Sequence, residues 1–391
     1  MPLILIALYA GALIALIQVS RRSQPNRKTD SSWYQPFSES TNNNLSTRAQ
    51  RIKDDPFKAD LGVTISTLYD IDLSAGSYYA EGCAWLKYDE MPLWMRDEWD
   101  PEIYECPVKT IAFINVVDRQ DFSQSPEPSL PDTDDDGRKI HWLEFSGRFV
   151  ATEADLDLRL FPFETVTLPI DLELGDFYVG EAIVNHQQSG PILTAPPKVN
   201  GYSCLTTSVR QCMHVYKTNW GFEYAKNYFG KENHSEFIAF KVETVFRRNA
   251  WNSFFNIFMP LIIVMVVVIA APLVAIQDYQ TKLAIPASAL LVLVFLQDGY
   301  KKILPPGLNY PTLADLIYIY NMLITIVVFL WSLMQTKLYF ASQLAGRQAS
   351  QAQLAGTMDN VFFAVTLVFA LLAPCLFYAA CRRHQVLAAN A

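Results

Sequence analysis

The sequence lacks the short motifs by which many enzymes are recognised. It contains no GxSxG nucleophile elbow, no HExxH pair and no glycine-rich phosphate loop. Its carboxylates are numerous but are not arranged in any recognisable catalytic pattern. We therefore expect no enzymatic activity and no cofactor.

Cysteine is scarce, and the spacing of the 6 cysteines matches no zinc site. Cys375 and Cys381 lie in an apolar segment, where we expect them to act as packing residues. Cys204 with Cys212, and Cys83 with Cys106, are left as two candidate disulfides, because connectivity cannot be deduced from sequence.

Basic residues are outnumbered by acidic ones, 31 Lys and Arg against 39 Asp and Glu. Beyond residue 250 only four residues are acidic, so the negative excess lies in the first part of the chain. An acidic front half argues against a nucleic-acid partner and is compatible with nearby cations or amines.

Beyond residue 250, charge is missing altogether from three long segments, residues 253–276, 316–336 and 360–381. Each is long enough to cross a bilayer as a helix. A fourth segment, 281–305, is apolar but has only 15 uncharged residues between Lys282 and Asp298, fewer than the ~20 that a spanning helix needs. We predict a transmembrane domain at 250–384 with helices at about 253–276, 282–303, 312–336 and 359–381, and a short cytoplasmic link at 337–358.

The fourth segment has a distinct stripe when its residues are placed at helical spacing. The stripe begins small and polar, passes two bulky apolar residues and ends in charge, as the wall of a water-filled pore would. The alternative is an amphipathic helix buried within the bundle of its own chain. The predicted pore-lining residues are Ala284, Ser288, Leu291, Phe295, Asp298 and Lys302.

The N-terminus carries a 15-residue apolar run at 3–17, which has the length of a signal-peptide core. The basic residues that normally precede such a core are missing, and Arg21 and Arg22 follow it instead. Residues 1–20 therefore form either a signal peptide, which we favour, or an anchor, and the polar residues 21–58 form a flexible lead-in. With four later crossings, the domain at 59–249 and the C-terminus share the extracytoplasmic side of the cell membrane, the inner membrane in a Gram-negative cell.

Residues 59–249 alternate in short apolar and polar steps bounded by turn residues, which predicts an all-β, immunoglobulin-like sandwich. Within it, Asp132, Asp134 and Asp136 imitate the first half of a calcium loop, but Leu143 stands where the closing Glu belongs. An Asp-Gly hairpin turn is the simpler interpretation.

Several motifs in order resemble those of the pentameric ligand-gated ion channels, the Cys-loop receptor superfamily. DLDLRLFPFETVTLPIDLEL at 155–174 resembles the signature loop, with Phe161-Pro162-Phe163-Glu164 at the Phe-Pro-Phe-Asp position. AEGCAWLKYDE, AFINVVD, FRRNAWNSFFNIFMP and ILPPGLNYPTLAD continue the resemblance, which spans roughly 61–381. The loop cysteines would fall at Ala154 and Leu168, so the signature disulfide is absent, as in bacterial members.

The sequence leaves two features of the predicted pore helix undecided. Pro286 lies inside the aligned helix, where it either kinks it or marks its first turn. Aligning on Pro305 puts the family's basic residue at the pore mouth on Lys282 and the central leucine on Leu291, which is the register we favour. A second register would instead line the pore with Leu283, Ala287, Leu290, Val294 and Gln297.

The resemblance implies a homopentamer with agonist bound between neighbouring sandwiches, and a surface that couples binding to gating. Glu164 facing Arg248 is the ion pair we expect at that surface. The coupling residues implied are Asp72, Phe161, Pro162, Phe163, Glu164, Arg248 and Pro305. The ligand-binding residues implied are Tyr88, Phe113, Phe177, Tyr178, Trp220, Phe222, Tyr224, Tyr228 and Phe229.

Aromatic walls of this kind bind ammonium groups or aromatic ligands, although sandwich cores are aromatic too. Protons are a further candidate agonist, with His141, His186, His214 and His234 in the outer domain. Asp278 and Asp298 favour selectivity for monovalent cations, whereas Lys302 argues against it. The alternative function is a membrane-bound solute sensor that does not conduct.

Overall fold

The computed structural model describes residues 2–22, 34–37, 47–98, 101–126, 131–187, 191–194, 199, 201–231, 233–344 and 348–389. The chain divides into two compact units. One is built from strands and comprises residues 26–156 and 166–247; the other is helical and comprises residues 1–25, 157–165 and 248–391. The short segment 157–165 is thus part of the helical unit although strands of the other unit flank it in the sequence.

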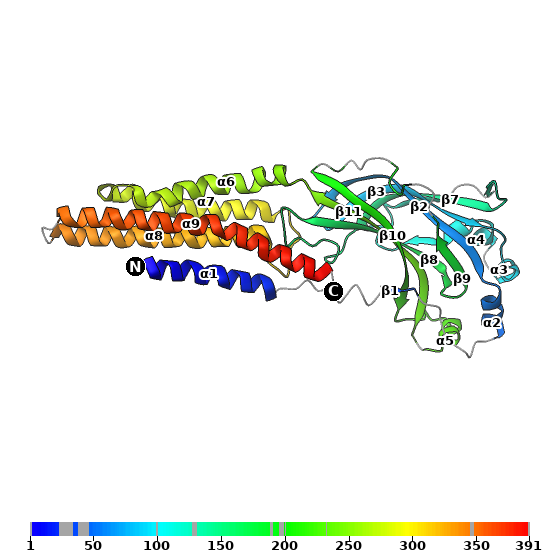
Figure 1. The fold of residues 1–391 in the computed structure, drawn as a ribbon. Helices are drawn as coiled ribbons and strands as arrows, with labels where there is room; N and C mark the ends of the chain where they lie inside the picture. Colours follow the sequence, from blue (N-terminus) through cyan, green and yellow to red (C-terminus); the bar gives the residue numbers. More distant parts are fainter. Residues whose placement is uncertain are drawn as a thin grey trace. The chain divides into compact units, whose positions relative to one another are not determined.

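Two sheets form the first unit, which has the predicted sandwich-like architecture (Figure 1). One sheet has the strand order β1-β10-β11-β8-β4, and the other β5-β7-β3-β2-β9, with β6 paired to β7. The strands are β1 (Tyr34–Pro36), β2 (Phe57–Asp72), β3 (Ser77–Tyr88), β4 (Ile111–Phe113), β5 (Ser123–Pro126), β6 (Asp132–Thr133), β7 (Lys139–Val150), β8 (Thr165–Tyr178), β9 (Ala182–His186), β10 (Tyr202–Tyr216) and β11 (Ser235–Arg248).

Alternating apolar residues explain why the long strands face each other. In β3 and β7 nearly every second residue is buried, so one face of each strand supplies the core. Phe57, Tyr78, Phe149 and Phe240 are among the largest side chains enclosed there. Short helices complete the unit: α2 (Thr47–Asp54), α3 (Leu93–Glu98), α4 (Pro101–Glu105), η2 (Pro107–Thr110) and α5 (Glu223–Phe229).

Several local predictions for this unit differ from the structure. Within the lead-in at 21–58, the structure has β1, α2 and the start of β2; residues 23–33 and 38–46 lie outside the described residues. Residues 108–117 form part of the alternating pattern that predicts strands, but in the structure they contain only the end of η2 and the three-residue β4. The polar stretch around Cys204 and Cys212 is the single strand β10, and all six cysteines are free. Eight residues of one strand span roughly 26 Å, whereas a disulfide needs Cα atoms within about 7 Å, so that pairing was wrong.

The calcium-like stretch at Asp132–Gly137 forms a turn. The backbone N–H groups of Asp134 and Gly137 donate to the carbonyls of Arg138 and Asp134, at 2.9 and 2.8 Å. Gly137 has φ of +81°, which an L-residue rarely adopts. The Asp134 carboxylate pairs with Lys87, and no cluster of three metal-ligating side chains occurs within the described ranges.

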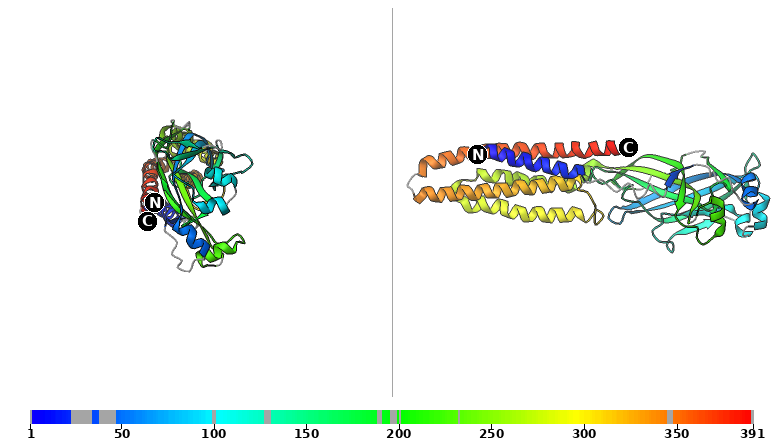
Figure 2. Two further views of the ribbon diagram at one scale, coloured as in Figure 1. Left: turned by 90° about the vertical axis from the view of Figure 1, so that its right-hand side faces the viewer. Right: turned by 90° about the horizontal axis from the view of Figure 1, so that it is seen from below.

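The second unit contains four helices long and apolar enough to cross a membrane, which makes the chain a multi-pass membrane protein. They are α6 (Ala250–Ala270), α7 (Tyr279–Lys301), α8 (Leu313–Leu344) and α9 (Gln348–Ala389). η3 (Ala271–Leu273) and η4 (Ile276–Asp278) connect α6 to α7. A further helix, α1 (Pro2–Arg22), lies along α9 in both Figure 1 and Figure 2.

Both α8 and α9 extend into the region predicted as a cytoplasmic link at 337–358, leaving 345–347 between them outside the described residues. This region is rich in Ala, Gln and Leu, which favour helix, so its polarity did not indicate a loop. Pro286 lies inside α7, seven residues after its start. The helix therefore does not begin at Ile285, and the Lys282 carbonyl receives no backbone N–H from position 286.

Candidate functional site

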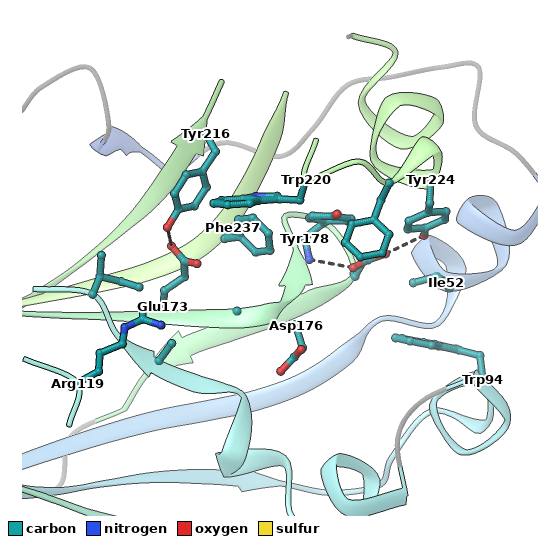
Figure 3. A pocket seen from close by; sticks show the side chains of 15 residues that line it. Ile52, Trp94, Arg119, Glu173, Asp176, Tyr178, Tyr216, Trp220, Tyr224 and Phe237 are labelled. Carbon is teal, nitrogen blue, oxygen red and sulfur yellow. Dashed lines mark hydrogen bonds between the residues drawn. The ribbon is translucent and has the colours of Figure 1, made fainter. Parts of the chain in front are cut away.

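A pocket of about 650 Å³ lies within the strand unit, at one end of β8 and β11 (Figure 3). β8 contributes Glu173, Asp176 and Tyr178, and the segment after β10 contributes Trp220 and Phe222. The remaining lining residues are Ile52, Trp94, Ala112, Ile114, Arg119, Gly175, Glu181, Tyr216, Tyr224 and Phe237.

Aromatic rings form a continuous wall along this pocket. The rings of Tyr216 and Trp220 meet edge to face with centroids 5.3 Å apart, and Tyr216 meets Phe237 in the same way at 5.6 Å. Phe237 lies 5.0 Å from Tyr178, which stacks 6.1 Å from Tyr224. A wall of this kind offers several ring faces to a cation or to a flat ligand.

Trp220 has a backbone conformation that favours glycine, with φ of +54°. Thr218 and Asn219 hold it there, because their side chains accept hydrogen bonds from the backbone N–H groups of Trp220 and Gly221 at 3.1 and 3.2 Å. The indole of Trp220 remains largely exposed beside the pocket. Two hydrogen bonds from the backbone to neighbouring side chains thus position a large exposed ring beside the pocket.

Three carboxylates accompany the rings. Glu173 is buried, and its Oε2 accepts a 3.0 Å hydrogen bond from the Tyr216 hydroxyl and lies 2.6 Å from Nδ1 of His214. Glu181 is also buried and receives the Tyr224 hydroxyl at 2.7 Å and the Tyr178 backbone N–H at 2.8 Å (Figure 3). Asp176 accompanies them, and Arg119 is the single cation among the described lining residues. The site as a whole therefore favours a positively charged ligand.

The environment of the pocket also raises the pKa values of three of its own side chains. Asp176 is exposed at the pocket, and neighbouring protein atoms reduce the hydration of its carboxylate enough to raise its pKa. Burial and the nearby charge of Glu173 raise the pKa of Tyr216, and burial and Glu181 raise that of Tyr178. Both phenols therefore stay neutral hydrogen-bond donors near pH 7.

The turn between β8 and β9 depends on Gly180. Its φ is +96°, and a Cβ there would lie 2.7 Å from the hydroxyl of Tyr228. That hydroxyl donates to the Val179 carbonyl at 3.0 Å, which fixes α5 against the turn that carries Glu181. Tyr228 is thus a supporting residue under the pocket.

Of the residues predicted to bind ligand, the structure brings Tyr178, Trp220, Phe222 and Tyr224 together at the pocket. Tyr228 and Phe229 pack beneath them with Ala49 and Ala225. The other three are buried core residues: Tyr88 contacts His141, Phe113 contacts Phe145, and Phe177 stacks on Phe57. The sequence did not point to Tyr216, Phe237, Glu173 or Asp176, although acids within an otherwise apolar strand were a usable signal.

No family model and no curated protein matches this chain. The resemblance to the pentameric ligand-gated ion channels therefore stays a prediction from the sequence motifs.

On α7 and at Lys302 directly after it, every residue of the favoured pore-lining register is exposed in the single chain. Leu291 and Phe295 are 60% and 67% exposed, whereas Leu293 on the opposite face is fully buried. In the second register Leu283, Leu290 and Gln297 are only partly exposed, whereas Ala287 and Val294 are exposed. Asp298 and Lys302 pair with each other at 3.0 Å, so their charges largely cancel.

Lys282 lies on the packed side of α7 rather than on the stripe. Its side chain is 0% exposed, and Nζ lies 2.7 Å from Oδ2 of Asp359 and 2.8 Å from the Pro272 carbonyl. The Asp359 Oδ1 accepts a hydrogen bond from the Trp331 indole at 2.8 Å. The residue that the alignment put at the pore mouth thus ties the start of α7 to α9.

The predicted ion pair between Glu164 and Arg248 is present, with Glu164 completely buried. Arg248 also lies over the Phe161 ring at 5.5 Å, and its backbone N–H donates to the Glu164 carbonyl at 3.2 Å. The rings of Phe161 and Tyr300 at the end of α7 are 6.3 Å apart.

The segment 157–165 also contacts the α7–α8 connection, which contains Pro305. The Tyr310 hydroxyl accepts the Leu158 N–H at 3.1 Å, and Leu313 N–H donates to the Arg159 carbonyl at 2.8 Å. Asp72 lies in the strand unit, where its carboxylate accepts hydrogen bonds from Ser74 and Ala75. These hydrogen bonds lower the pKa of Asp72, and the bond from the Ser74 hydroxyl has the largest effect.

Proposed function

We propose that this chain is the subunit of a homopentameric ligand-gated ion channel of the Cys-loop receptor type, located in the cell membrane, the inner membrane in a Gram-negative cell. A small organic cation opens it, and it conducts monovalent cations. The observation that carries the proposal is the stripe on α7, whose small, apolar and charged residues face away from the bundle while the opposite face is packed.

An exposed stripe of this composition needs an environment other than lipid. The exposed ion pair of Asp298 and Lys302 is costly against hydrocarbon, whereas a water-filled pore between several copies of α7 would hydrate it. Rings of Leu291 and Phe295 from each copy would form the narrow apolar zone that gates by dewetting. The number five follows from the family resemblance.

In this proposal the pocket is the ligand-binding site. Its ring wall and three carboxylates suit an ammonium group, or an aromatic amine that uses both. Such a ligand shifts the equilibrium towards the open state only if it binds that state more tightly.

Two neighbouring strands supply a route from pocket to pore helix. β8 begins directly after Glu164 and carries Glu173 to Tyr178 at its other end, and β11 runs from Phe237 at the pocket to Arg248. The two strands are adjacent in one sheet, and the Glu164–Arg248 pair joins their far ends. A shift at the pocket can therefore reach the segment that contacts Tyr300 of α7.

Recordings from the full-length protein in planar bilayers test the proposal, with tetramethylammonium, aromatic amines and pH steps as stimuli. Leu291→Ser should raise leak current or agonist sensitivity severalfold, because a hydroxyl wets the apolar ring. Leu293→Ser, on the buried face two residues away, is the matched control and should lower stability without raising leak.

Intact pentamers that never conduct, with a Leu291→Ser variant that is merely less stable, would refute the channel and support the non-conducting sensor. A monomer in native mass spectrometry would refute the assembly.

A further inference from the structure

The N-terminal helix α1 packs within the helical unit. In two views turned by 90°, α1 lies beside α9 and runs in the same direction (Figures 1 and 2). Both helices belong to the same compact unit. This packing indicates that α1 is a part of the folded protein and not a leader that is removed.

Among the described side chains, one polar contact and one ring contact join the two helices. The Tyr9 hydroxyl lies 3.2 Å from Oγ1 of Thr366, and the rings of Tyr9 and Phe369 are 5.5 Å apart. Tyr9 is 1% exposed, and Leu13, one turn further, is buried as well. Leu8 and Ile14, on other faces of α1, are more than half exposed. α1 therefore has one packed face and one face suited to lipid.

The Tyr9 hydroxyl explains why the packing is specific. In hydrocarbon an unpaired hydroxyl is costly, and α1 has few polar side chains with which to satisfy it. Thr366 is buried on α9 and provides the partner. The contact links positions 357 residues apart in the chain, so local sequence does not enforce it.

The register also fits a spanning helix. α1 has 21 residues, and only the last two, Arg21 and Arg22, are charged; about 20 residues are needed to cross the hydrocarbon core. Both helices rise ~1.5 Å per residue, so with Tyr9 level with Thr366 the two arginines fall near Tyr378. That level is close to Arg382, where the apolar stretch of α9 ends.

The sequence after the apolar run does not favour removal by a signal peptidase. Such enzymes cut after a small residue that has another small residue two positions before it. Between Leu16 and Ser23 no two small residues have that spacing.

We propose that α1 stays in the mature protein as a fifth membrane-spanning helix, held on α9 through Tyr9 and Thr366. Its N-terminus then lies on the opposite side of the membrane from the strand unit, since α1 leads directly into that unit. This inference does not depend on the channel function, because a sensor would retain the helix equally.

The first test uses the unmodified full-length protein purified through a C-terminal tag. The intact mass should include residues 1–22, apart from the removal of the initiator Met. A mature chain that begins beyond Arg22 would overturn the proposal.

The second test places a photo-reactive benzoylphenylalanine at Tyr9 and, as a matched control, at Leu8. Illumination in membranes should join position 9 to the α9 peptide that contains Thr366 and Phe369, at least severalfold more than position 8. Equal labelling from both positions, or capture of lipid alone at position 9, would overturn the docking.

Discussion

Lys282 shows what a single charge requires inside an apolar bundle. Its ammonium group is fully enclosed and is satisfied by one carboxylate and two backbone carbonyls, those of Pro272 and Val274. Such a pair adds little to stability compared with an apolar pair of the same shape, but removing one partner leaves an isolated buried charge. Lys282 therefore fixes where α7 begins relative to α9.

We expect Lys282→Met to destabilise the helical unit by about 3–5 kcal/mol, because Asp359 would remain charged and buried. Adding Asp359→Asn should recover most of that loss, since the amide oxygen still accepts the Trp331 N–H. Thermal unfolding of the detergent-solubilised protein measures both variants. Equal stability of the single variant and the parent would contradict the pairing.

Asp176 gives the pocket a dependence on pH. Its pKa is raised above the ordinary value of about 3.9 for Asp, and a bound cation favours the ionised form. As the pH falls through this raised pKa, the carboxylate is protonated and its attraction for a cation is lost. Glu173, Glu181 and Arg119 face the same space.

We therefore expect the affinity for tetramethylammonium to weaken as the pH falls through the raised pKa of Asp176, and Asp176→Asn to reduce that dependence at the cost of weaker binding near pH 7. Fluorescence titration of the full-length protein, read from Trp220 and Trp94, is the measurement. Glu144→Gln, an exposed acid on β7 outside the pocket, is the control and should behave as the parent. An unchanged pH profile in Asp176→Asn would assign the effect to the other carboxylates.

Strands β8 and β11 connect the pocket to the helical unit through chain continuity. Because each has one end at the pocket and the other at the Glu164–Arg248 pair, ligand binding and gating should be separable by mutation at the far end.

Arg248→Gln should shift the open–closed equilibrium by about tenfold to a hundredfold, since a charged hydrogen bond contributes about 1.5–3 kcal/mol, while the affinity of the closed state for the ligand stays nearly unchanged. Parallel binding titrations and current recordings measure the two effects. The control is Arg138→Gln, which breaks an ion pair with Asp60 elsewhere in the strand unit. Equal loss of binding and current in Arg248→Gln would indicate damage to the fold instead.

Among the helices and strands, the sequence alone predicted those elements whose pattern lies within a single segment of the chain. Charge-free runs identified α6, α8 and α9, and alternation identified β2, β3, β7, β8 and β11. The sequence did not predict the position of side chains whose packing depends on residues far away in the chain. The burial of Lys282 depends on Asp359, 77 residues away, and the pocket joins Glu173 to Tyr216, 43 residues away. Tyr88 and Phe177 share the aromatic character of the pocket residues, and only tertiary packing places them in the core.

In the proposed pentamer, the distribution of charge along α7 would decide ion selectivity. Lys282 is turned inward and neutralised by Asp359, and Asp298 and Lys302 cancel at the other end of the stripe. Asp278, immediately before α7, is exposed and has no basic partner among the described residues. In a pentamer, Asp278 would form a ring of five unneutralised carboxylates at that mouth of the pore.

Such a ring raises the local concentration of cations and repels anions. We expect Asp278→Asn to lower the cation-to-anion permeability ratio severalfold, and the loss to be larger at low ionic strength, where screening is weaker. The reversal potential in asymmetric salt measures the ratio. The double variant Asp298→Asn/Lys302→Gln removes two charges of opposite sign and should shift the reversal potential much less. A reversal potential that stays fixed in Asp278→Asn would show that another group sets selectivity.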